Sequence, residues 1–415
     1  MVYILVFILL SFLIYYYDIK GNENRKDFWY GISLFSLVLL SGLRYRIGGD
    51  TIAYMHNFYY ETPFIWDLSW SDIKDSSFEP FFVLLTSTVK TLCGKFFVFQ
   101  LLHAVFVNGL IFSYIRKHCN QIFTCILFYY LWMYALYNFE EIRASMSLAL
   151  CLFANDYILE KKWIKGFCLY FIGCMFHYST FIILLTPLLF FLRMNLIGIT
   201  VLILSLVGGY LIKNNFNDYL LLLEFNDYAS EKASMYAQSE TYFQNSKNIR
   251  VIILTIVPYV LYSFFSFLFL KRQFSENNQK EISLLRFQPV IIIGLSFQIL
   301  SISMPICYRF FHFYIIYFIM FFSNFFIGLI KKDIQLSVPI ALIRSIILFI
   351  PIFNIFSHIY RYPTKESTKS NIYYDYEKYY PYSSVLERSV SERRENIYRN
   401  LGSIMYYIQP KESEY

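Results

Sequence analysis

Charged residues are scarce in this chain of 415 residues. They make up 16% of the sequence, against roughly 25% in an ordinary soluble domain, whereas hydrophobic residues make up 57% and aromatic residues 21%. A soluble domain of this length does not need so much apolar surface, and a disordered chain does not contain it. The composition therefore excludes a typical soluble enzyme, a disordered chain and a coiled coil. It predicts a protein that faces lipid.

The sequence also lacks the usual signatures of metal, redox and nucleic-acid binding. Its seven cysteines form no Cys-x-x-Cys pair and no Cys/His metal spacing. The net charge of +7 is modest, and the basic residues are scattered between apolar runs instead of forming a nucleic-acid patch. There is no acid-rich cluster suited to Mg²⁺, and the first segment has no cleavage signature. We therefore expect a retained membrane anchor, with no metal and no cofactor.

Long apolar runs are what the sequence does contain. A helix needs about 20 apolar residues to cross the hydrocarbon core, so residues 163–193 are too long for one span, and a polar break at His177 divides them. Residues 80–93 are apolar but short, and predict an interfacial or re-entrant helix. The predicted fold is all-α and polytopic, with about 12 transmembrane helices at 2–17, 28–43, 96–115, 121–137, 142–159, 163–177, 179–193, 195–212, 249–270, 287–304, 310–330 and 334–356.

Basic residues orient these spans. If the spans alternate in direction, most short basic loops fall on one side, which the positive-inside rule makes cytoplasmic. The predicted domains are a transmembrane domain, 1–356, and a polar, Tyr-rich extracytoplasmic tail, 357–415. Besides that tail, the extracytoplasmic side receives the loops 44–95, 138–141, 213–248 and 305–309.

One outer motif combines two arginines with a predicted tight turn. It reads Arg44-Tyr45-Arg46-Ile47-Gly48-Gly49-Asp50 and follows the second span. Backbone amides at such a turn and guanidinium forks suit a phosphate or pyrophosphate. The alternative is an interfacial arginine pair beside a capped turn.

Three further outer motifs each carry an arginine or a histidine. Arg143 opens a helix against its dipole, so it needs an anionic partner, either a ligand or a neighbouring Glu140 or Glu141. His177, between two short helices, is either a general base or a structural residue. Arg309 lies in a short hinge that reaches over the bundle. All four motifs fall on one predicted face, where fixed guanidinium groups would stabilise a leaving pyrophosphate.

With these motifs, roughly residues 1–350 resemble the EpsG-like or Wzy-type polysaccharide polymerases of bacteria. The resemblance rests on Leu43–Thr51 with Tyr54, on Arg143 opening a helix rich in Ala and Ser, and on Phe176-His177-Tyr178-Ser179. It implies a metal-independent glycosyltransferase of the GT-C type, in a bacterial plasma membrane and active at the extracytoplasmic face. Such a protein joins repeat units carried on undecaprenyl pyrophosphate into O-antigen, capsule or exopolysaccharide. A flippase and a chain-length regulator are its implied partners.

Residue by residue, the resemblance gives each motif a part in glycosyl transfer. Arginines would hold the pyrophosphate, a base would take the proton of the acceptor hydroxyl, and tyrosines would stack on sugars. The implied residues are Arg44, Arg46 and Arg143 for pyrophosphate, with Arg309 added by topology; His177, Asp50 and Arg143 for catalysis; and Tyr45 and Tyr54 for sugar.

Two other functions stay open. A flippase for a lipid-linked glycan predicts paired halves with broken helices in matching positions, whereas the sequence has one broken region and no repeat. A membrane O-acyltransferase needs a deep His or Asp that is reached from the cytoplasmic side, whereas the predicted histidine and arginines cluster outside.

Overall fold

A computed structural model of the chain describes residues 2–212, 259–261, 263–268, 270–271, 284–304, 306–331 and 375–400. In these residues the fold is helical, and an isolated β-bridge between Arg44 and Ser384 is its one strand-like pairing. The expected span at 334–356 and most of that at 249–270 lie outside the described residues. The all-α class is thus confirmed, while the count of about 12 spans and the GT-C-like arrangement stay predictions.

The helices differ widely in length. The π-helical turns are η1 Ile14–Ile19, η2 Asn57–Glu61 and η3 Leu136–Glu140, and the 3₁₀ turns are η4 Thr186–Leu189 and η7 Asp375–Lys378. The α-helices are α1 Val2–Leu13, α2 Lys26–Gly42, α3 Thr51–His56, α4 Trp70–Asp75, α5 Pro80–Cys93, α6 Phe96–His118, α7 Ile122–Trp132, α8 Ile142–Leu159, α9 Trp163–Phe176, α10 Thr180–Ile183, α11 Leu196–Ile212, α17 Gln288–Leu300, α18 Cys307–His312, α19 Ile315–Ile330 and α21 Glu392–Asn400.

Three helical segments in the described part of the chain are long and apolar enough to cross a membrane. They are Val2–Ile19, Phe96–His118 and Ile142–Leu159, and shorter apolar helices accompany them. The predicted break at His177 is present, because α9 ends at Phe176. The stretch after the break was expected to be one span, but it forms only the short α10 and η4. Pro187 within η4 lacks the N–H that a continuous helix would use.

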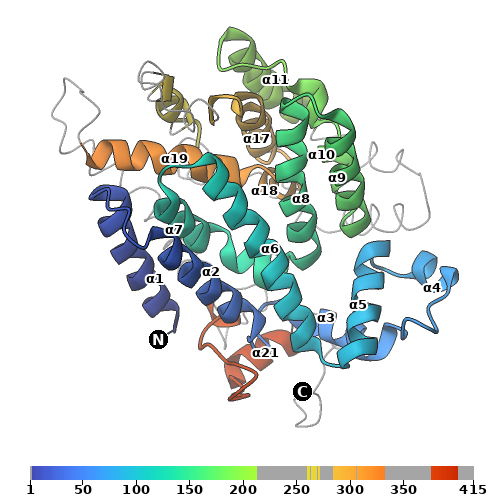
Figure 1. The fold of residues 1–415 in the computed structure, drawn as a ribbon. Coiled ribbons are helices and arrows are strands. Elements are labelled where there is room, and N and C mark those ends of the chain that lie inside the picture. Colours follow the sequence, from blue (N-terminus) through green and yellow to red (C-terminus); the bar gives the residue numbers. More distant parts are fainter. Residues whose placement is uncertain are drawn as a thin grey trace.

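Polar contacts define two ends of the bundle. At one end His103 of α6 contacts the carbonyl of Ile142, and at the other Lys117 of α6 pairs with Asp156 of α8, so α6 and α8 run in the same direction. Asp27 at the start of α2 pairs with Arg116, so α2 runs the opposite way. In Figure 1, α6 crosses the molecule with α1 and α2 on one side and α8 and α9 on the other. We call these ends the Arg143 end and the Arg116 end.

The described part of the tail, residues 375–400, packs against the Arg143 end. The Tyr45 amide donates to the carbonyl of Ser383 over 2.8 Å, and the Val385 amide donates to that of Leu43 over 2.9 Å. Figure 1 shows α21 beside the end of α2 and near α3. These residues are therefore joined closely to the part of the chain predicted as the transmembrane domain.

Candidate functional site

Glu79 joins two of the predicted site residues. One carboxylate oxygen accepts a hydrogen bond from the Arg143 guanidinium over 2.6 Å, and the other lies 3.0 Å from Nδ1 of His177. The Tyr178 amide also donates to Glu79, over 3.2 Å. The carboxylate itself is buried, but the side chains of Arg143 and His177 are 16% and 23% exposed. The arrangement is thus an Arg–Glu–His chain whose two ends reach the surface.

Local structure explains why these residues meet. Arg143 lies in the first turn of α8, and His177 follows the last residue of α9, which runs back beside α8. The two helices pack closely at Gly173, where a Cβ would lie 3.0 Å from the Ser147 hydroxyl. Small residues allow such close approach between membrane helices. Pro80 opens α5 and leaves Glu79 at its N-cap, facing the α8–α9 pair.

The Glu79 carboxylate is held in its ionised form by the two residues that it joins. Burial alone would raise the pKa of Glu79, but the hydrogen bond from His177 and the charge of Arg143 lower it to about 2. Glu79 is therefore ionised at neutral pH. Tyr54 accepts a longer hydrogen bond from Arg143 over 3.4 Å, and the Phe78 ring lies 4.6 Å from the guanidinium carbon. These contacts fix the orientation of Arg143.

A second histidine–carboxylate pair lies close by. His312 of α18 contacts both oxygens of Glu141 through Nδ1, at 3.0 and 3.1 Å. Burial alone would raise the pKa of Glu141, but His312, Arg309 and His177 together lower it. Glu141 therefore lies within electrostatic range of Arg309, which is exposed, and of His177. The short hinge that carries Arg309, which was predicted on the extracytoplasmic side, thus contributes to the same region as the Arg–Glu–His chain.

Asp50 faces this region from the turn before α3. Desolvation and the nearby charge of Glu140 raise its pKa to about 7, against the opposing pull of Arg309, Arg143 and Lys378. The Asp50 side chain is also exposed, so solvent screening limits the size of this shift. The upward direction follows from the neighbouring Glu140 carboxylate.

The turn amides that were expected to suit a phosphate already bind an anion of the chain. The Glu140 carboxylate accepts hydrogen bonds from the amides of Gly49 over 2.6 Å and Asp50 over 3.1 Å, and from the Tyr379 hydroxyl over 2.9 Å. Gly48 makes this closure possible, since its φ is +107° and a Cβ there would lie 2.4 Å from the carbonyl oxygen of Phe139. Glu140 therefore occupies the place proposed for a ligand.

The arginines of this turn are also used internally. Arg46 forms two hydrogen bonds with the Glu395 carboxylate, at 2.9 and 2.7 Å, and both side chains are buried. Arg44 is fully buried and donates to the carbonyls of Ser41 and Ile47. Tyr45 is buried as well. All three side chains are thus buried against groups of the protein itself, and the expectation that Arg44 and Arg46 hold pyrophosphate and that Tyr45 stacks on sugar stays a prediction.

The structure brings together Arg143, His177, Tyr54, Asp50 and Arg309. It also adds three residues that the sequence-based prediction missed or left without this role: Glu79, Glu141 and His312. The one signal for Glu79 is an isolated acid directly before a proline that opens an apolar helix. The expected alternative partners of Arg143 were Glu140 and Glu141, but Glu140 binds the turn and Glu141 pairs with His312.

These features define a class: a helical membrane protein with a polar site of arginine, histidine and carboxylate at one end of its bundle. Residues 27–384 match the model of the EpsG family, and the chain belongs to that family. The match includes Glu79, Arg143, His177 and Arg309, and extends into the tail segment that packs on the turn. Family membership indicates a membrane protein of polysaccharide synthesis. Comparisons with curated proteins and with solved structures gave no match.

Proposed function

We propose that this protein is a polysaccharide polymerase. It joins oligosaccharide repeat units carried on undecaprenyl pyrophosphate, and the reaction takes place at the Arg143 end of the bundle. The observation that carries the proposal is the Arg143–Glu79–His177 chain, because it puts an anion-binding group and a proton acceptor on one carboxylate. Family membership supports the same class of reaction.

In the proposed reaction, a sugar hydroxyl of the incoming unit attacks the anomeric carbon of the growing glycan. The new C–O bond forms as the bond from that carbon to the pyrophosphate oxygen breaks. His177 Nε2 takes the hydroxyl proton, since the ionised Glu79 carboxylate accepts the hydrogen bond of Nδ1–H and thereby selects the tautomer with Nε2 unprotonated. The pyrophosphate leaves with the bonding electron pair.

The leaving pyrophosphate needs cations that are held in place before the reaction begins. Arg143 is oriented by Glu79 and Phe78. Arg143 and Arg309 both lower the pKa of Asp50, so the two guanidinium groups lie in the same region. Preorganised guanidinium groups stabilise developing charge more effectively than mobile ones, because they need not reorganise during the reaction. In this proposal the Tyr54 hydroxyl helps to orient Arg143 through its hydrogen bond. The Asp50 carboxylate balances the positive charge of the arginines when no substrate is bound.

The side of the membrane on which the site lies is inferred from the basic residues at the ends of the bundle. Arg116, Lys117, Lys161 and Lys162 lie at or just beyond the Arg116 end, which the positive-inside rule places in the cytoplasm. The Arg143 end would then face the outside of a bacterial plasma membrane. Repeat units would reach it after a flippase has moved them across.

The surface-glycan ladder of a deletion strain tests the proposal. The strain is rescued with wild type, Arg143→Ala, His177→Ala or Arg116→Ala, and the amount of each protein in the membrane is measured by immunoblot. We expect the first two variants to export single repeat units without a ladder. Arg116→Ala is the matched control, because it removes an exposed arginine at the opposite end, and it should keep the ladder.

Other patterns would contradict the proposal. Loss of all exported units would indicate a flippase. A normal ladder with altered acetyl content would indicate an acyltransferase. A normal ladder and acetyl content in Arg143→Ala would remove Arg143 from the site.

A further inference from the structure

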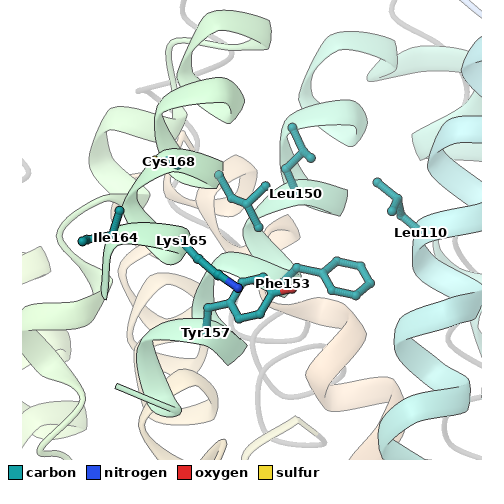
Figure 2. Close-up of a pocket in the computed structure, with 8 residues that line it drawn as sticks. Leu110, Leu150, Phe153, Tyr157, Ile164, Lys165 and Cys168 are labelled. Atoms are coloured by element: carbon teal, nitrogen blue, oxygen red, sulfur yellow. The ribbon is translucent and has the colours of Figure 1, made fainter. Parts of the chain in front are cut away.

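A groove opens on the side of the bundle, away from the candidate site. It lies between α6, α8 and α9 and has a volume of about 380 Å³, at the small end of the range for ligand pockets (Figure 2). Leu110 of α6, Leu150 and Phe153 of α8, and Ile164 and Cys168 of α9 contribute to its lining. Because α6 and α8 are long and apolar enough to cross a membrane, we expect the groove to face hydrocarbon.

One charged residue, Lys165, lines this apolar groove. It lies in the first turn of α9, next to the Arg116 end, and its side chain extends across the groove toward Tyr157 of α8 (Figure 2). Among the described residues Lys165 has no hydrogen bond or ion pair. The neighbouring Lys162, in contrast, is bonded to Glu160 over 2.6 Å. Lys165 is exposed, so its ammonium is available to an anion at the edge of the membrane.

The residues around Lys165 place it at a membrane interface. Trp163 and Ile164 are 49% and 81% exposed, and aromatic side chains of this kind mark the level of the lipid headgroups. The helix dipole adds a positive partial charge at the start of α9, which is unfavourable for a lysine unless an anion is near. Apolar lining below and a cation above match a lipid with a negatively charged headgroup.

We propose that the groove binds an anionic phospholipid, with one acyl chain between α6, α8 and α9 and its phosphate paired with Lys165. Basic positions between transmembrane helices on the cytoplasmic side are typical sites for such headgroups. The lipid would fill the space between α9 and α6 and so support the helix that ends at His177. This inference does not depend on the proposed polymerase reaction.

Native mass spectrometry of the full chain in nonionic detergent tests the proposal. The probes are dioleoylphosphatidylglycerol and dioleoylphosphatidylcholine, each titrated against wild type, Lys165→Gln and Lys162→Gln. We expect one phosphatidylglycerol per chain, in preference to phosphatidylcholine. Lys165→Gln should weaken its binding about fivefold, as expected for the loss of one cation near a lipid phosphate. Lys162→Gln is the matched control and should bind like wild type.

A second variant tests the groove without changing the charge. Leu150→Trp fills the space between α8 and α6, and should prevent phosphatidylglycerol binding while Lys165 remains. If that variant does not fold, Cys168 provides the same information in a Cys93→Ser background, since Cys93 and Cys168 are the exposed thiols of the described residues. Phosphatidylglycerol should slow the reaction of Cys168 with maleimide in wild type, and less so in Lys165→Gln.

Three results would overturn the proposal. Equal binding of the two lipids with no effect of Lys165→Gln would mean non-specific contact with the bilayer. Absence of bound phosphatidylglycerol would mean that the groove does not retain a lipid. Displacement of the lipid by undecaprenyl phosphate at equal concentration would mean that the groove serves a polyprenyl chain.

Discussion

Two arginine-bearing regions lie at the Arg143 end, and they differ in how their charges are neutralised. In the turn of residues 44–50, Arg46 is buried against Glu395, Arg44 is buried and donates to backbone carbonyls, and the turn amides bind Glu140. In the region of Arg143, the Glu79 carboxylate is shared between Arg143 and His177, and both remain partly exposed. We call the first region the closed turn and the second, whose arginine and histidine are partly exposed, the open region.

This difference assigns different work to similar residues. A buried, doubly hydrogen-bonded ion pair contributes to the specificity of the fold, and removing one partner leaves an uncompensated charge. A partly exposed arginine that is held by one carboxylate can exchange or share that contact with an incoming anion. The closed turn therefore positions Asp50 and the start of α3, while the open region does the proposed chemistry.

The largest expected effect concerns the closed turn. Arg46→Ala leaves the Glu395 carboxylate buried without its partner, and should lower the free energy of unfolding by about 3–5 kcal/mol. Thermal unfolding of the purified protein in detergent measures this, with the exposed pair of Arg116 and Asp27 as control, where Arg116→Ala should cost less than about 1 kcal/mol. The double variant Arg46→Met/Glu395→Met should recover most of the loss. A stable Arg46→Ala protein that makes no polymer would instead place Arg46 in the substrate site.

The second prediction concerns acid stability in the open region. The pKa of Glu79 is about 2 in the folded protein and 4.5 in its unperturbed state, so its contribution is complete above pH 4.5 and disappears as the pH falls toward 2. The shift corresponds to about 3 kcal/mol. Glu79→Gln should flatten the stability curve in this pH range, whereas Glu23→Gln, which removes an exposed acid in the loop before α2, should not. An unchanged curve in Glu79→Gln would mean that His177 and Arg143 do not stabilise the Glu79 carboxylate.

How far the sequence predicted these two regions depends on the range of the contacts. The helical class, α8 at 142–159 and the break at His177 follow from local apolar runs and turn chemistry, and the structure contains them. The pairing of Arg46 with Glu395 joins residues 349 positions apart, and no local pattern specifies it. Glu79 was missed for the same reason, since its partners lie on α8 and α9. A sequence shows which charges need a counter-charge, whereas the fold decides whether the chain provides it.

The third prediction concerns the proton acceptor of the open region. His177→Ala should lower polymer formation about a hundredfold, which is the lower range for loss of a general base. The unfolding temperature should fall at neutral pH, because the hydrogen bond from His177 is the largest of the contacts that lower the pKa of the Glu79 carboxylate. Glu79 keeps its bonds to Arg143 and the Tyr178 amide, so activity is compared at a temperature at which both proteins are folded. Incorporation of labelled repeat units into long chains in membrane vesicles measures the rate. Full activity in His177→Ala would leave His177 with a structural part only.

The smallest expected effect lies where the two regions meet, at Asp50. Burial and the charge of Glu140 raise its pKa toward 7, and solvent screening at this exposed residue reduces the shift, so the carboxyl ionises between its ordinary range and pH 7. The same shift means that ionisation of Asp50 disfavours the folded state as the pH rises from 3.8 toward 7. In the proposed site the ionised carboxylate competes with pyrophosphate for Arg143 and Arg309, so the KM for the lipid-linked donor should rise with pH as Asp50 ionises and should be highest above pH 7.

Asp50→Asn removes this competition and separates the two candidate bases. The variant should show no rise of KM with pH, and at pH 8 its KM should be about threefold lower than that of wild type, as expected for one partly screened charge pair. Its kcat should be close to that of wild type, because the proton is taken by His177. If Asp50 were the base, Asp50→Asn would instead lose kcat at every pH while His177→Ala retained it, and the proposed chemistry would move from the α8–α9 pair to the turn before α3.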